Sequence, residues 1–309
     1  MTEKEKIISQ IDILYNSVYQ YRTCTEFRKR LEFCAQFKSM SAFNAMLIEM
    51  QMPCARYYVL RADEWASKYS RVIKHDARPM IILVPFGPVS YVFDISDTKP
   101  NNNNLFLYSD EDILSEIEMP YRTKSDIDIK LLETFCLNVE CHGILINPDF
   151  KAATSYAGKI ELYDKGYFTY TYKKQNLSSP CDYLISINKN AKPGKFFASL
   201  CHELGHLFCH HIYSPYQAWD VRNLSNSAEE FEAEIVSWLV CERLNIGNPS
   251  EKYLASYCDN NEEIPSISIE RIFTAVNDIE KMLKTKLSIK DGIKYKYDKK
   301  FKAIIDSIK

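Results

Sequence analysis

The segment from Phe196 to His211, FFASLCHELGHLFCHH, restricts the possible folds more than any other part of the chain. Its apolar residues recur at helical spacing, and they are Phe196, Phe197, Leu200, Leu204, Leu207 and Phe208. This period predicts an amphipathic helix with one face in a core. The same segment holds four of the six histidines of the chain, and two of them belong to an H-E-x-x-H motif.

The histidines of the motif, His202 and His206, are four residues apart, so a helix places them on one face about 5–6 Å apart at Cβ. Two imidazoles in this arrangement can bind one Zn²⁺. Glu203 lies beside them and suits a general base acting on a water that the metal activates. Gly205 costs a helix about 1 kcal/mol relative to alanine, which predicts that another segment approaches its backbone closely.

A catalytic zinc site requires a third protein ligand and an open fourth position. In the helix predicted over 227–240, Glu230 and Glu234 are four residues apart and share a face. The run E-x-x-A-E resembles the Glu-zincin arrangement, in which a helix with E-x-x-A-D follows H-E-x-x-H. This resemblance implies that Glu230 binds the metal and that Glu234 orients His202 or His206. Spacing alone leaves Glu234 as the alternative ligand.

The segment between these two helices contains candidate donors for a tetrahedral oxyanion, and they are Tyr213, Tyr216, Trp219 and Arg222. Spacing does not choose among them. His210 and His211 are predicted to be surface or packing residues, because Glu230 already completes the ligand set.

The composition is that of an ordinary globular protein, with 309 residues, 46% hydrophobic and 26% charged. This length predicts two domains, placed at residues 1–120 and 121–309. The net charge of −2 argues against bulk binding of nucleic acid. We expect no membrane span, because no run of 18 apolar residues occurs. Ten scattered cysteines and an N-terminus without a secretory signal pattern predict a cytoplasmic protein.

The remaining pattern predicts an α+β fold, with a small N-terminal α+β module followed by a zincin-like domain with a small sheet and C-terminal helices. Helices are expected over 3–35, 41–51, 126–138, 227–244, 251–258 and 268–287. Strands are expected over 80–85, 89–93, 143–147, 167–173 and 182–188, with turns at 87–88, 157–158 and 164–166. A strand directly before the H-E-x-x-H helix is usual in zincins, and its edge commonly pairs with an extended peptide.

Residues 41–53, SAFNAMLIEMQMP, resemble the S-x-x-N-x-x-L-I-x-x-Q-x-P pattern of ArdC N-terminal domains. Trp65 and the segments 78–85 and 92–98 continue this likeness. The C-terminal half resembles ArdC and ImmA/IrrE metallopeptidases through HELGH and EEFEAEI. Together the resemblance covers roughly residues 20–290.

ArdC N-terminal domains are associated with single-stranded DNA binding, so the resemblance implies that aromatic and basic residues of this module contact DNA. The candidates are Trp65, Lys68, Arg71, Lys74 and Arg78. Bases stack on aromatic rings for roughly 1–3 kcal/mol each. The alternative is that the aromatic residues form a core and the basic residues form a solvated face.

The expected function is that of a zinc-dependent endopeptidase. ImmA/IrrE metallopeptidases cleave regulatory proteins such as transcriptional repressors, often on mobile genetic elements. The resemblance therefore implies a protein substrate of this kind, with the N-terminal domain as a recruitment module. The alternative is an anti-restriction-type protein that binds single-stranded DNA and whose metal site is secondary or structural.

Overall fold

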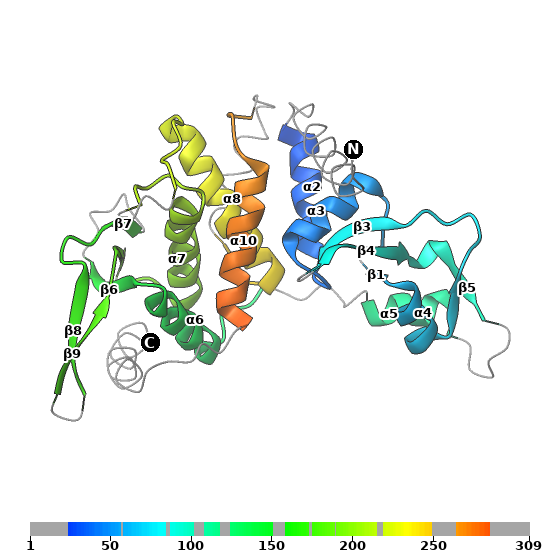
Figure 1. Ribbon diagram of the computed structural model, residues 1–309, viewed down its shortest axis with the longest axis horizontal. Coiled ribbons are helices and arrows are strands. Elements are labelled where there is room, and N and C mark those ends of the chain that lie inside the picture. Colours follow the sequence, from blue (N-terminus) through cyan, green and yellow to red (C-terminus); the bar gives the residue numbers. More distant parts are fainter. Residues whose placement is uncertain are drawn as a thin grey trace. The chain divides into compact units, whose positions relative to one another are not determined.

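The computed structural model describes residues 24–56, 58–84, 87–101, 108–117, 124–150, 158–172, 175–188, 190–214, 219–248 and 264–284. They form two compact units. The N-terminal unit comprises the described residues up to 117 with residue 264, and the C-terminal unit comprises 124–248 and 265–284. Each unit combines helices with small sheets (Figure 1), so the predicted α+β class is confirmed. The predicted helices at 3–23, 251–258 and 285–287 lie outside the described residues.

The N-terminal unit is built on a three-stranded antiparallel sheet in the order β1 (Val59–Leu60), β4 (Gly87–Asp94), β3 (Met80–Val84). Helices α2 (Cys24–Gln36) and α3 (Ala42–Gln51) precede it. Ser41 accepts a hydrogen bond from the Asn44 N–H, which confirms the predicted cap of α3. The predicted turn at 87–88 is wrong, because Gly87 already pairs with Val84 as the first residue of β4.

A second group of short elements completes this unit. They are α4 (Ala62–Tyr69), β2 (Arg71–Ile73), the 3-10 helix η1 (Ile95–Asp97), β5 (Thr98–Pro100) and α5 (Asp110–Ile117). Strands β2 and β5 pair antiparallel. Buried apolar residues of this group form one cluster, made of Leu60, Trp65, Tyr69, Ile95 and Ile113. The indole of Trp65 donates to the Phe93 carbonyl at 2.9 Å, which fixes the ring inside this core.

Two side-chain amides of α3 continue the backbone hydrogen bonding of β3. Asn44 donates to the Leu83 carbonyl at 2.9 Å and accepts from the Leu83 N–H at 3.0 Å. Gln51 donates to the Ile81 carbonyl at 2.9 Å and accepts from the Ile81 N–H at 2.8 Å. Because the two amides are two helical turns apart, they meet alternate residues of the strand. The Asn and Gln of the 41–53 pattern therefore join a helix to a strand.

The C-terminal unit has a three-stranded sheet in the order β6 (Ile144–Phe150), β10 (Tyr183–Asn188), β7 (Gly158–Leu162). Strand β10 is parallel to β6 and antiparallel to β7. Both edges of β10 are therefore occupied, and the expectation that this strand offers an edge to a peptide is wrong. Among the described strands the edges lie at β6 and at β7. The sequence predicted only a turn at 157–158 where β7 begins.

Four helices complete this unit, two that contact the sheet and two that pack on those helices (Figure 1). They are α6 (Ile129–Cys141), α7 (Pro193–Phe208), α8 (Asn226–Leu244) and α10 (Ile269–Lys284). Helix α7 contacts β7 and β10 as well as the other three helices, so it lies at the centre of the unit. A separate hairpin of β8 (Tyr167–Tyr172) and β9 (Gln175–Pro180) stands apart from these layers in Figure 1.

The ends of α7 and α8 follow from local chemistry. Pro193 is at the start of α7, where its missing N–H has no helical partner to lose. Ser225 caps α8 by accepting from the Ala228 N–H, and Asn245 ends it in the left-handed conformation at φ 59°. Among the described helices, none is both long enough and apolar enough to cross a membrane.

We predict that Gln51→Met destabilises the N-terminal unit by about 1–3 kcal/mol, because it leaves the Ile81 N–H and carbonyl without their partner. Chemical denaturation of the full chain measures the change. The matched control is Gln36→Met at an exposed position, where we expect a change within about 0.5 kcal/mol. Equal stability of the two variants would contradict the role of the amide.

Candidate metal centre

Helices α7 and α8 approach each other closely at Gly205. A Cβ built on Gly205 would lie 3.0 Å from the Ala233 Cα and 3.3 Å from the Ala233 carbonyl oxygen. No side chain fits in this gap without displacing the α8 backbone. The close approach that the glycine predicted is therefore confirmed, and it brings the histidine face of α7 against the first turns of α8.

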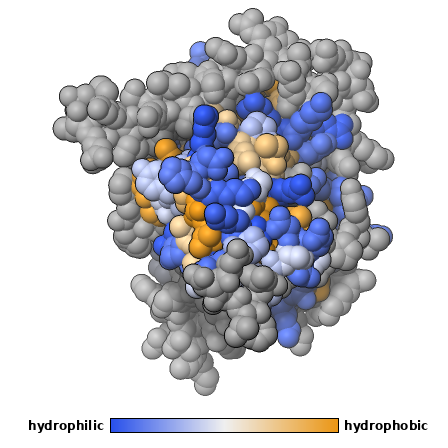
Figure 2. All heavy atoms as spheres, turned by 90° about the vertical axis from the view of Figure 1, so that its right-hand side faces the viewer, coloured by the Kyte–Doolittle hydropathy of each residue, from blue (hydrophilic) through white to orange (hydrophobic). Residues whose placement is uncertain are grey.

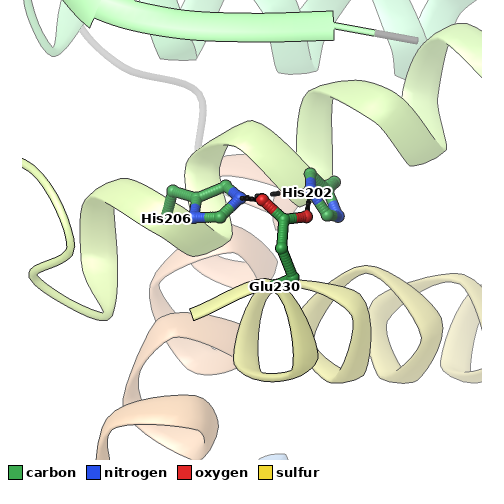
Figure 3. A group of neighbouring side chains, drawn as sticks. All are labelled: His202, His206 and Glu230. Carbon is green, nitrogen blue, oxygen red and sulfur yellow. Dashed lines mark hydrogen bonds and ion pairs between the residues drawn. The ribbon is translucent and has the colours of Figure 1, made fainter. Parts of the chain in front are cut away.

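His202, His206 and Glu230 converge at this crossing, with the Glu230 carboxylate between the two imidazoles (Figure 3). The two Nε2 atoms of the histidines are 3.1 Å apart. One carboxylate oxygen of Glu230 lies 3.4 Å from the His202 Nε2, and the other lies 3.5 Å from the His206 Nε2. The structure thus brings together the three residues that the sequence predicted as ligands.

These separations fit a tetrahedral ion. Ligand atoms bound at roughly 2.0–2.1 Å to the centre of a tetrahedron are about 3.3–3.4 Å from one another. The two nitrogens are 3.1 Å apart, and they lie 3.4 and 3.5 Å from two different oxygens of Glu230, so the observed separations are close to this value. Two imidazole nitrogens with one carboxylate also form the donor set of many zinc enzymes. These three residues could hold a divalent metal.

The charges around the three residues also favour a cation at this site. Burial disfavours a charged His202, but the Glu230 and Glu234 carboxylates outweigh it and raise the pKa of His202 to about 10. Burial and the neighbouring His202 lower the pKa of His206. The two carboxylates therefore favour a positive charge beside these histidines.

Glu203 lies beside these residues and is held against the sheet. Its side chain is buried and accepts a hydrogen bond from the Ile160 N–H of β7. A Cβ on Gly158 would lie 2.8 Å from its Oε1, so the carboxylate occupies space that only a glycine leaves free. Burial raises the pKa of Glu203 to about 7, despite the opposing effect of His202. A carboxyl group with this pKa can take up and release a proton near neutral pH.

Glu234 is on the same face of α8 as Glu230 and lies farther from the pair of Nε2 atoms. Its Oε2 is 3.8 Å from the Nδ1 of His202, longer than a hydrogen bond. This places Glu234 behind His202 rather than behind His206. The position agrees with the predicted orienting role, and it does not make Glu234 a member of the ligand cluster.

The sequence missed a buried network on the other side of His206. His211 was predicted to be a surface or packing residue. It is buried, and its Nδ1 lies 3.0 Å from the His206 Nδ1. Its Nε2 lies 2.9 Å from Glu232, a fully buried residue that also accepts from Arg222 and from the Ser268 N–H. Burial raises the pKa of Glu232, but these donors outweigh it and leave the pKa below its usual value.

Two of the four candidate oxyanion donors are engaged elsewhere. Arg222 binds Glu232, and the Trp219 indole donates to the Ile212 carbonyl at 2.9 Å while its ring stacks on His210. Tyr213 is exposed, and Tyr216 lies outside the described residues. Spacing along the chain could not separate these roles, because each depends on contacts with distant segments.

The candidate DNA-binding residues of the N-terminal unit do not form one exposed surface. Trp65 is fully buried, and Arg71 is buried and pairs with Asp110 at 2.7 Å. Lys68, Lys74 and Arg78 are exposed, and Lys74 bonds to the Ser96 carbonyl. Figure 2 shows a described surface that is mostly hydrophilic, with a smaller apolar area. The prediction that Trp65 and Arg71 contact DNA is wrong, because both serve the core.

Comparison of the chain with models of protein families, with curated proteins and with solved structures gives no match.

We predict that Gly205→Ala destabilises the C-terminal unit by about 1–3 kcal/mol, because the added methyl group forces α7 and α8 apart. A thermal melt followed by circular dichroism measures this change. Gly247→Ala is the matched control, since a Cβ there meets nothing within 4 Å. If the Gly205→Ala and Gly247→Ala variants have the same melting temperature, α7 and α8 tolerate a wider separation at their crossing.

Proposed function

We propose that the chain is a zinc-dependent peptidase whose active site is the His202–His206–Glu230 cluster. One observation carries this proposal: two histidines and a glutamate that could hold a metal ion lie next to a buried Glu203, whose pKa burial raises to about 7. A closed structural zinc site uses four protein ligands. Among the described residues the cluster contains three ligands, which favours a catalytic site with a position for a reactant.

The residues have distinct roles in this reaction. When bound, Zn²⁺ supplies a Lewis acid and lowers the pKa of a water at the open position towards about 7. Glu203 accepts the proton as this water attacks the scissile carbonyl, and it then delivers a proton to the leaving nitrogen. The Ile160 N–H and the missing side chain of Gly158 keep the Glu203 carboxylate oriented for both transfers.

A zincin-like arrangement of the C-terminal unit supports an endopeptidase. The sheet lies against α7, and β7 both contacts Glu203 and forms one edge of the described sheet. An extended peptide that pairs with this edge would pass beside the proton acceptor. This reading replaces the predicted role of the β10 edge with one for β7.

The class of substrate rests on resemblance. The likeness to ImmA/IrrE metallopeptidases favours a regulatory protein, such as a transcriptional repressor, with the N-terminal unit as recruitment module. The alternative of a single-stranded DNA-binding protein is weaker, because Trp65 and Arg71 are buried and only Lys68, Lys74 and Arg78 of its candidates are exposed.

We predict that the purified wild-type chain binds about one zinc per molecule. Glu230→Ala should lose it, because Glu230 alone supplies the third donor of the cluster. Glu234→Ala should bind zinc more weakly but still measurably, since it acts behind His202. Elemental analysis after dialysis gives these values, with Glu229→Ala as the control on the same helix. Loss of zinc in Glu234→Ala with retention in Glu230→Ala would move the third ligand to Glu234.

We predict that Glu203→Gln retains zinc but cleaves peptides at least about 100-fold more slowly, because the amide cannot accept the proton. The zinc-loaded full chain is incubated with a complex peptide library, and new N-termini are counted by mass spectrometry. Wild-type chain with a chelator is the control for contaminating proteases. Cleavage by Glu203→Gln at the wild-type rate would remove Glu203 from the mechanism.

A further inference from the structure

His211 faces the side of His206 that the proposed metal does not use. The Nε2 of His206 points toward Glu230 and His202, as Figure 3 shows for Glu230. The other nitrogen, Nδ1, lies 3.0 Å from the Nδ1 of His211. Each ring nitrogen of His206 therefore has a different partner, and the proton on the ring decides which of them can bind a cation.

The backbone brings His211 to this place. Helix α7 ends in a Schellman motif, in which the His211 N–H bonds to the His206 carbonyl at 2.9 Å and the His210 N–H bonds to the Leu207 carbonyl at 3.1 Å. His210 adopts the required left-handed conformation at φ 63°. In this motif the second residue beyond the cap lies next to the third residue before it. His211 and His206 occupy these two positions.

Glu232 sets the direction of the hydrogen bonds. An ionised carboxylate only accepts, so the His211 Nε2, 2.9 Å away, carries a hydrogen. Arg222 already balances the charge of Glu232 through two guanidinium nitrogens, and the Ser268 N–H bonds to the same carboxylate at 2.6 Å. The other nitrogen of His211, Nδ1, faces the Nδ1 of His206 at 3.0 Å. The carboxylate thus holds the His211 ring in the orientation that bonds to His206.

We propose that His211 is a positioning residue that holds the His206 ring through Nδ1 and so directs the His206 Nε2 toward the proposed metal position. Glu232 and Arg222 hold His211 in the orientation that this requires. The inference deepens the proposed metal site and rests on it, but it does not depend on peptidase activity. It also assigns a role to Glu232, a buried acid of α8 that does not share the face of Glu230 and Glu234.

The same residues do not form a second metal site. The Cys209, His211 and Glu232 donor atoms lie within 4.8 Å of one another. The Arg222 guanidinium, however, occupies both oxygens of Glu232 and would repel a cation. Both nitrogens of His211 are engaged as well. The group acts as a hydrogen-bonded support for His206.

The test compares three variants of the full chain. His211→Leu removes both hydrogen bonds and places an apolar side chain of similar size in the buried position. His211→Asn keeps an acceptor at the place of Nδ1, and so retains the bond to His206. His210→Asn is the matched control, because asparagine tolerates the left-handed conformation and His210 does not touch the Nδ1 of His206. Thermal melts establish that each variant is folded.

Zinc affinity is measured by competition with a chromophoric chelator. We expect His211→Leu to bind zinc about 10- to 100-fold more weakly than wild type. His211→Asn should recover most of this loss, and His210→Asn should match wild type. A folded His211→Leu variant with wild-type affinity would overturn the inference, and so would an equal loss in His211→Leu and His211→Asn.

Long-range ¹⁵N–¹H NMR of the imidazoles in the metal-free wild type provides an independent measurement. We expect the spectra to show a hydrogen bond between the Nδ1 atoms of His206 and His211, and its absence would overturn the inference. This readout separates the two proposals. A wild-type chain that binds no zinc refutes the proposed function, while the NMR result still decides the role of His211. A chain that binds zinc but cleaves nothing leaves the affinity comparison intact.

Discussion

The close crossing of α7 and α8 at Gly205 is the contact on which the site depends. Glu230 belongs to α8 and the two histidines belong to α7, so the three donor atoms meet only when the helix backbones nearly touch. The absence of a side chain at Gly205 permits this distance. Packing and coordination are therefore coupled here, because a metal that binds all three residues also joins the two helices.

The sequence predicted this part of the site because its information is local. Helical periodicity places His202 and His206 on one face, and the same rule selects Glu230 and Glu234 on the next helix. The closeness of a second backbone at Gly205 could also be inferred, since glycine is costly inside a helix. The spacing could not decide between Glu230 and Glu234, and the distances from the histidines place Glu230 in the cluster.

Features that depend on distant contacts were not predictable. The segment up to His211 was predicted to be helical, but α7 ends at Phe208 and His210 adopts the left-handed conformation. No glycine marks this end in the sequence. Nothing near Glu232 in the sequence indicates burial, but it is fully buried and bonded to partners ten or more residues away. Strand β9, Gln175–Pro180, lacks β-branched residues and forms by pairing with β8. Trp65 likewise gives no local sign of whether its ring faces solvent or core.

The amides of Asn44 and Gln51 have a consequence for self-association. Strand β3 is at the edge of the described sheet, where unpaired backbone groups are a template for another chain. The two side chains of α3 occupy the donors and acceptors of Ile81 and Leu83 on this edge. A second molecule would have to displace both amides before it could add a strand. The helix thus protects the β3 edge of this sheet from edge-to-edge aggregation.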